Sequence, residues 1–191
     1  MRAVAIVLGS VLAMEGVSYL THRFVMHGFG IGLHASHHDP GDGGFELNDL
    51  YPLMFSTLSI AVFAVGTLWP SLRSLVLVGV GQTLYGVAYL FVHEIYIHRR
   101  LKLVNGTYRP LEWLKASHRI HHLYGGEPYG MLLPVVPAAL RARAASATWD
   151  PFARSEPALT GSGRSSSSSS LGSSGPATES RPAGACGPAS G

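Results

Sequence analysis

Three long apolar runs dominate the chain and restrict it to one kind of fold. They cover residues 3–20, 50–69 and 72–92, and each can cross a hydrocarbon layer of about 30 Å as a helix. Inside lipid the backbone amides must bond to one another, and a helix achieves this within a single segment. The sequence therefore predicts an all-α integral membrane protein with three transmembrane helices.

A fourth apolar stretch, residues 131–140, is too short to span and contains Pro134 and Pro137. We expect it to be interfacial or re-entrant, which makes the total three to four membrane helices. The first run has an alternative interpretation as a signal peptide. Glu15 within it and His22 directly after it favour a span that is retained.

Composition supports a membrane domain followed by a polar tail of low complexity. The chain has 191 residues and is 47% hydrophobic and 13% charged, whereas soluble domains carry about 25% charged residues. Its single cysteine, Cys186, excludes a disulfide, a self-ligated iron–sulfur cluster and a thiolate-ligated haem from the rest of the chain. We predict a membrane domain over 1–154 and a disordered Ser/Gly/Pro-rich tail over 155–191.

All ten histidines fall in four short clusters that alternate between a pair and a triplet. The pairs, HRFVMH and HEIYIH, have the spacing H-x-x-x-x-H, and the triplets, HASHH and HRIHH, have the spacing H-x-x-H-H. The ten are His22, His27, His34, His37, His38, His93, His98, His118, His121 and His122. With three spans, residues 21–49 and everything after 93 share one side of the membrane, so all four clusters lie there.

Basic residues indicate which side this is. Seven of them accompany the histidines: Arg23, Arg99, Arg100, Lys102, Arg109, Lys115 and Arg119. The opposite side has only Arg2 and Arg73. The positive-inside rule therefore predicts that the histidines face the cytoplasm. The net charge of +3 does not call for a nucleic-acid partner, and the basic residues would meet anionic membrane lipid or an acidic protein.

The histidine spacing is typical of metal ligands. On a helix, positions i, i+3 and i+4 share a face, so each triplet converges. The pairs are separated by five residues and need a helix end or an irregular turn to converge. Ten imidazoles exceed what one metal takes, whereas two metals with four or five nitrogens each would use them and keep positions open. Four nearby carboxylates are expected to orient the imidazoles from behind: Asp39, Glu46, Asp49 and Glu94.

Other features have simpler interpretations. Any one histidine cluster could be structural, but four spaced clusters on one side argue against chance, and a metal-storage tract would be a compositional run. The aromatics Tyr85, Tyr89, Phe91 and Tyr96 suit packing better than substrate contact. Gly79, Gly81 and Gly86 predict close helix approach, with room for a long flat ligand as the alternative.

These motifs resemble the fatty acid hydroxylase superfamily of membrane di-iron oxygenases, and within it the bacterial β-carotene 3-hydroxylases. The resemblance covers about residues 13–137 and rests on HRFVMHGFGIGLHASHHDP, FELNDLYPLMF, VHEIYIHRRL and HRIHHLYGG. It implies a non-haem monooxygenase of the bacterial inner membrane with two iron ions held by the ten histidines. It further implies O₂ as co-substrate, a carotenoid that enters from the bilayer, and reduced ferredoxin as electron donor. The apolar IYI of the third cluster and the serine-rich tail depart from the family pattern.

Two rival functions remain at this stage. The first is another oxygenase on the same scaffold, namely a carotenoid ketolase or a lipid or sterol hydroxylase or desaturase. The second is a non-enzymatic metal-binding or metal-transport membrane protein. That function predicts ionisable residues deep in several spans, where this sequence offers little beyond Glu15.

Overall fold

The computed structural model describes residues 1–38 and 45–152, and this part of the chain is all-α. The predicted disordered tail and the predicted boundary at residue 154 lie outside the described residues. The elements are α1 (Arg2–Leu20), η1 (Thr21–Phe29), α2 (Ile31–His34), η2 (Ala35–His38), η3 (Leu47–Asp49), α3 (Leu50–Leu68), η4 (Pro70–Leu72), α4 (Ser74–Leu90), η5 (Phe91–Ile97), α5 (Arg109–Tyr124) and α6 (Ala138–Ala145).

The three predicted spans are confirmed. Helices α1, α3 and α4 are long and apolar enough to cross a membrane, and with their helical extensions they cover Arg2–Phe29, Leu47–Leu68 and Ser74–Ile97. Large apolar side chains along them, such as Leu8, Leu58 and Leu84, are exposed. An exposed apolar surface of this extent is what lipid would cover.

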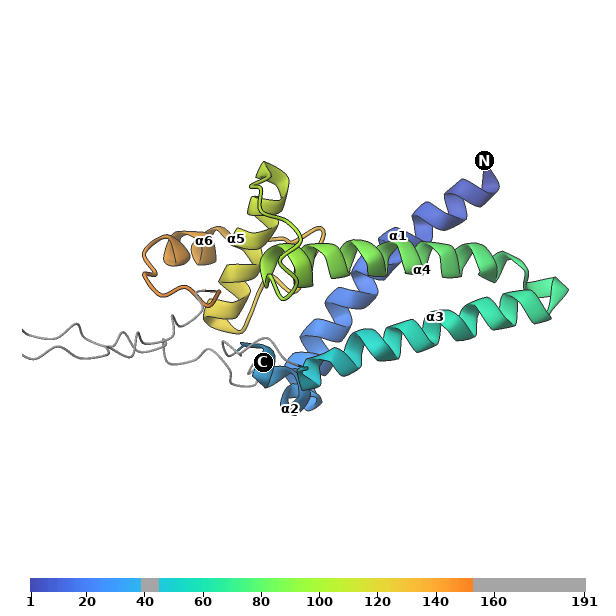
Figure 1. The fold of residues 1–191 in the computed structure, drawn as a ribbon, viewed down its shortest axis with the longest axis horizontal. Coiled ribbons are helices and arrows are strands. Elements are labelled where there is room, and N and C mark those ends of the chain that lie inside the picture. Colours follow the sequence, from blue (N-terminus) through green and yellow to red (C-terminus); the bar gives the residue numbers. More distant parts are fainter. Residues whose placement is uncertain (39–44, 153–191) are drawn as a thin grey trace, which may run out of the picture.

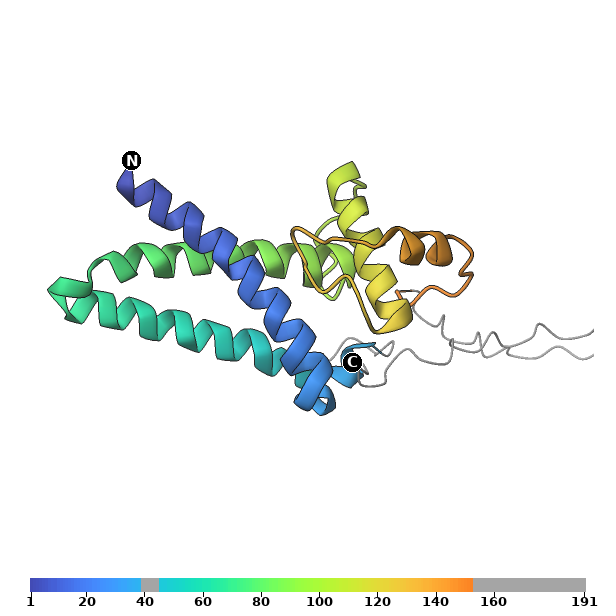
Figure 2. The ribbon, with the colours of Figure 1, turned by 180° about the vertical axis from the view of Figure 1, so that it is seen from behind.

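The spans meet at one end of the molecule. Helices α3 and α4 form a hairpin that is closed by η4, and α1 crosses α4 (Figure 1). Helices α5 and α6 and the short α2 gather at the end opposite to the N-terminus and the hairpin turn (Figures 1 and 2). Helix α5 runs across the ends of the spans, and a buried apolar cluster that includes Val92, Ile97, Leu114 and Met131 ties it to η5.

Gly81 permits the crossing of α1 and α4. A Cβ atom at Gly81 would lie 2.5 Å from Cβ of Ser10 and 2.7 Å from the carbonyl oxygen of Val7. A Cβ atom at Gly79 would likewise lie 3.0 Å from the ring of Phe63. The prediction of close approach is therefore confirmed for these two glycines. It is wrong for Gly86, where an added Cβ atom would meet nothing within 4 Å.

Glu15 fastens the segment after α5 to the first span. Its carboxylate accepts hydrogen bonds from the backbone N–H groups of Met131, Leu132 and Leu133 at 2.9–3.3 Å and from the hydroxyl of Tyr85 at 2.7 Å. The apolar stretch 131–140 thus begins as irregular backbone beside α1 and only becomes helical at Ala138. Glu15 satisfies amides that a segment without regular structure would otherwise leave unpaired.

We expect Glu15→Ala to lower the free energy of unfolding by about 2–3 kcal/mol, because three backbone N–H groups lose a carboxylate acceptor. Denaturation of the purified chain in detergent, followed by circular dichroism, would measure the change. Thr67→Ala is the matched control, since that hydroxyl bonds to the Phe63 carbonyl within its own helix. An equal stability of the two variants would contradict the role of Glu15.

Candidate metal centre

Both H-x-x-x-x-H pairs are brought together by π-helices. His22 and His27 lie in η1, and His93 lies in η5 with His98 directly after it. A π-helix bonds residue i to residue i+5, so side chains five apart become neighbours, whereas on an α-helix they would point about 140° apart. The N–H of His98 donates to the carbonyl of His93 at 2.9 Å. The ring centroids are 5.1 Å apart in the first pair and 4.6 Å apart in the second.

The two triplets are carried differently. His118, His121 and His122 share a face of α5, as their spacing predicts. In the first triplet His34 ends α2, while His37 and His38 belong to the 3-10 helix η2. This triplet lies on two short helices and not on one regular α-helix, but its rings converge as predicted, with the His34 and His38 centroids 4.8 Å apart.

Nine histidines form two groups. Within each group, the candidate ligand atoms all lie within 4.8 Å of one another. The five-histidine set contains His22, His27, His34, His38 and His121, and the four-histidine set contains His37, His93, His98 and His118. His122 lies between the sets. Its ring stacks on His38 with centroids 4.4 Å apart, and its Nε2 is 2.9 Å from Nε2 of His118. All ten predicted ligands therefore lie in one cluster.

In five histidines Nδ1 lies against an oxygen. The acceptors are the carbonyl of Tyr129 for His22, Oδ1 of Asn48 for His34, Oε2 of Glu46 for His37, Oε1 of Glu94 for His93 and the carbonyl of Gly126 for His121, at 2.6–3.0 Å. A neutral imidazole that donates from Nδ1 keeps its lone pair on Nε2. The arrangement thus fixes the tautomer of each of these rings and points Nε2 into the cluster.

The Nε2 atoms then face one another. Nε2 of His22 is 3.3 Å from Nε2 of His34, and Nε2 of His37 is 3.1 Å from Nε2 of His93. Since all four rings donate from Nδ1, no proton stands between these lone pairs, and they repel unless a cation accepts both. Metal–nitrogen bonds of about 2.0–2.1 Å hold adjacent ligand atoms roughly 3 Å apart. The donor set therefore fits two metal ions.

Burial keeps the rings neutral. Removal from water, reinforced by the neighbouring histidines, lowers the pKa of His118, His121 and His122 well below the ordinary value of about 6.5. Burial also lowers the pKa of His34 and His37, although the hydrogen bond from His37 to Glu46 opposes this shift. Neutral imidazole is the form that binds a metal.

The predicted carboxylates take different positions. Glu46 and Glu94 accept hydrogen bonds from His37 and His93, as expected. Asp49 lies one step further out, where it pairs with Arg100 at 2.6 and 2.8 Å and accepts from the N–H of Glu46. Hydrogen bonds to Asp49 raise the pKa of Arg100 above its usual range. Asp39 lies outside the described residues.

The sequence did not predict several residues that hold or contact the histidines. Asn48 stands between Glu46 and Asp49 in the FELNDL stretch, and a polar amide so close to two carboxylates is the signal that could have found it. Gly125 ends α5 in the left-handed conformation (φ 66°), and this turn brings the carbonyl of Gly126 to His121. The carbonyls of Gly126 and Tyr129 carry no sequence signal at all. Phe152 stacks on His118 at 6.0 Å between centroids and also contacts the rings of His98 and His122.

An apolar cavity of about 430 Å³ lies between α1, α3 and α4. Its walls include Met26, Phe55 and Gly86, and one end reaches Asn48 and Glu94. Those two side chains hold His34 of the five-histidine set and His93 of the four-histidine set. The cavity therefore extends from the apolar interior of the spans to two side chains that bond to histidines of both sets. Tyr85 and Tyr89, expected to pack, also line it.

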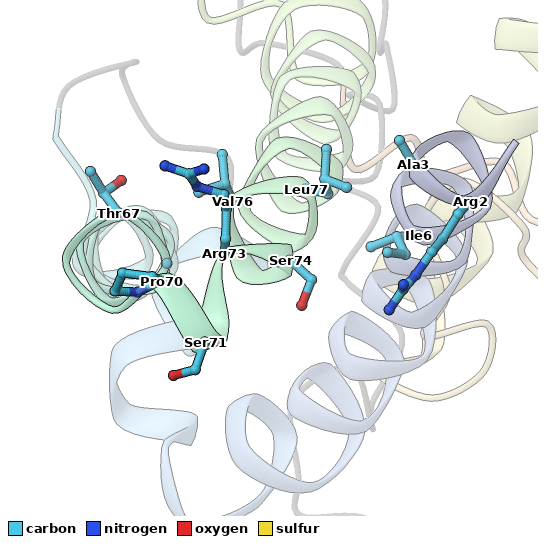
Figure 3. Close-up of a pocket in the computed structure, with 11 residues that line it drawn as sticks. Arg2, Ala3, Ile6, Thr67, Pro70, Ser71, Arg73, Ser74, Val76 and Leu77 are labelled. Carbon is cyan, nitrogen blue, oxygen red and sulfur yellow. The ribbon is translucent and has the colours of Figure 1, made fainter.

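A second hollow lies at the opposite end of the spans. It has a volume of about 790 Å³ and is open between the start of α1 and the hairpin turn, as Figure 3 shows. Arg2 and Arg73 line it together with small and apolar residues, and no histidine or carboxylate is among the described residues of its lining. We therefore place the chemistry at the histidine end.

The family comparison agrees with the geometry. The fatty acid hydroxylase family matches residues 7–139, which include both histidine sets, the second and third spans and most of the first span. This chain belongs to the fatty acid hydroxylase family. As a member, it is an oxidoreductase of the membrane, and its histidine cluster is a metal site.

Relatives within the fatty acid hydroxylase family carry more specific names. The β-carotene hydroxylase of Pseudescherichia vulneris is 40% identical over 152 residues, which are 72% of this chain and 80% of the relative. That of Pantoea ananas is 40% identical over 64% of this chain and 69% of its own length. The chloroplastic β-carotene 3-hydroxylase of an Oncidium hybrid is 37% identical over 70% of this chain and 45% of its own. No solved structure gives a significant match.

For this member of the family we expect metal and stability to be lost together as the pH falls. Unfolded histidines take up protons as the pH falls through about 6.5, whereas the buried rings have lowered pKa values and stay neutral. The unfolded state then binds more protons, so the free energy of unfolding decreases below about pH 6.5. Bound metal and Tm should both be lower at about pH 5 than at about pH 7.5, on either side of the ordinary histidine pKa.

Recovery of Tm and metal binding on return to the higher pH is the control against aggregation. Equal metal content and equal Tm at the two pH values would contradict the buried neutral histidines.

Proposed function

We propose that this chain is a β-carotene 3-hydroxylase, which adds a hydroxyl group to carbon 3 of each β-ionone ring. β-Carotene would become β-cryptoxanthin and then zeaxanthin, with O₂ as the oxygen source. The observation that carries the proposal is the 40% identity to two bacterial proteins named β-carotene hydroxylase, over most of both chains. The apolar cavity supports it, because one end reaches Asn48 and Glu94, whose side chains accept hydrogen bonds from His34 and His93.

The proposed cofactor is a pair of iron ions, and the ten histidines are the proposed ligands. Bound iron would supply the activation of O₂. The protein's own residues do the rest: Glu46, Glu94 and Asn48 hold imidazole tautomers that present Nε2, and Phe152 packs against three of the histidine rings. Exclusion of water from such a site protects a reactive centre from side reactions.

The cavity is the proposed position of the ring. Along α4 and η5 its lining runs from Gln82 to Glu94, which corresponds to about 18 Å of helix. Its volume lies within the range of about 300–1,000 Å³ that ligand pockets have. A β-ionone ring with part of its polyene fits such a space, and the rest of a carotenoid would lie in the bilayer. Entry from the lipid needs no water-filled path.

We further propose that the histidine end faces the cytoplasm of a bacterial inner membrane and receives electrons from reduced ferredoxin or a similar donor. The excess of basic residues on this side supports the orientation. Several of these arginines also have structural partners: Arg23 pairs with Glu127, and Arg119 bonds to backbone carbonyls near α6.

The test is expression in cells that accumulate β-carotene, followed by chromatography of the pigments with and without air. We expect zeaxanthin and β-cryptoxanthin to form in air and to be absent without it. Keto products would identify a ketolase instead. Unchanged β-carotene, with the protein in the membrane and iron and ferredoxin supplied, would overturn the assignment of substrate.

A single ligand substitution should abolish this turnover. We expect His118→Ala to form no zeaxanthin while the protein stays in the membrane, because His118 belongs to the four-histidine set and also contacts His122. Lys115→Ala on the same helix is the control and should retain activity. Full activity of His118→Ala would remove this residue from the proposed ligands.

Filling the cavity should block the substrate and leave the metal site intact. A side chain at Gly86 would extend into the cavity, so we expect Gly86→Leu to reduce zeaxanthin formation by about tenfold or more. Leu84→Phe is the matched control, because Leu84 is 53% exposed on the same helix and does not line the cavity. Pigment analysis and iron content report the two effects separately, and normal hydroxylation by Gly86→Leu would exclude this cavity.

A further inference from the structure

The oxygens behind the two histidine sets differ in charge. In the four-histidine set, His37 donates to the carboxylate of Glu46 and His93 donates to the carboxylate of Glu94, at 3.0 and 2.6 Å. In the five-histidine set, the acceptors for His22, His34 and His121 are uncharged: the carbonyl of Tyr129, the amide oxygen of Asn48 and the carbonyl of Gly126, at 2.6–2.9 Å.

This difference changes the ligands themselves. An imidazole that donates to a carboxylate becomes more basic and shares part of the negative charge, so its Nε2 binds a cation more strongly. An imidazole that donates to an amide gains much less. A cation held by the four-histidine set would therefore meet ligands richer in electrons, although that set has fewer nitrogens.

Arg100 keeps the two carboxylates in place. Its guanidinium donates to both oxygens of Asp49 at 2.6 and 2.8 Å and to Oε2 of Glu94 at 3.0 Å. This leaves Oε1 of Glu94 directed at His93. Asp49 in turn accepts from the N–H of Glu46 at 3.0 Å. Arg100 thus links Glu94, the acceptor for His93, through Asp49 to Glu46, the acceptor for His37.

We propose that the two metal positions are unequal, with the four-histidine set binding a divalent cation more tightly, and that Arg100 is the positioning residue for its carboxylates. The proposal rests on the two-metal site of the proposed function. It does not depend on the substrate, because the acceptor charges are properties of this chain alone.

The test is a titration of the purified, metal-free full chain in detergent with Co²⁺, an ion that imidazole sites accept, followed by calorimetry. We expect two binding steps of different affinity. Glu94→Gln should weaken the tighter step by about 10–100-fold and leave the weaker step unchanged. Asn48→Asp should strengthen the weaker step, since it places a carboxylate behind His34.

Arg100→Gln separates positioning from simple charge. Removal of a positive charge near a cation site would by itself strengthen cation binding, whereas loss of positioning should weaken the tighter step. Glu112→Gln is the control, because Glu112 accepts from Tyr96 and contacts no histidine within the described residues. Circular dichroism of each metal-free variant verifies that it is folded.

Two equal binding steps in the parent chain would overturn the proposal, as would an effect of Glu94→Gln and Asn48→Asp on the same step. Tighter Co²⁺ binding by Arg100→Gln would overturn the role of Arg100. No carotenoid or electron donor is present in this experiment. Unequal steps would therefore stand even if the pigment analysis failed, and equal steps would leave the assignment of β-carotene untouched.

Discussion

The repulsion between buried imidazole lone pairs is the constraint on which this structure depends. Ten histidines are gathered at the end of three apolar helices. There, burial lowers the pKa of residues such as His118 and His121 and keeps these rings neutral. Hydrogen bonds to Nδ1 direct several Nε2 atoms at one another at distances near 3 Å. A cation that accepts both lone pairs of such a pair removes this repulsion. The placement of α2, α5 and the segments between them brings these nitrogens together at one site.

The local helix type makes the unusual spacing usable. A pair of histidines five residues apart would diverge on an α-helix, and each pair instead lies on a π-helix that continues a membrane span. Each span thus continues into its histidine pair, and the axis of the preceding helix sets the direction of both rings. No separate loop is needed to carry these four histidines.

The sequence predicted what depends on periodicity and composition. The spans at 3–20, 50–69 and 72–92 correspond closely to α1, α3 and α4, because apolar length alone decides them. The histidines, with Glu46 and Glu94 behind them, could also be proposed from residue type. The carbonyls of Tyr129 and Gly126 could not, since any residue offers a carbonyl and only tertiary structure selects one. The prediction for Gly86 was wrong because a glycine that permits helix contact and one that borders a cavity look alike in sequence.

The bond between Glu15 and residues 131–133 also determines when the site can exist during synthesis. Its partners lie 116–118 residues apart, and the second span, the third span and α5 are all made between them. The first span is made early, and its acceptor Glu15 meets its partners only after residues 131–133 have been synthesised. His121, which completes the five-histidine set, is likewise among the last ligands to be synthesised. The histidine cluster therefore cannot be complete until all three membrane helices and α5 have been synthesised.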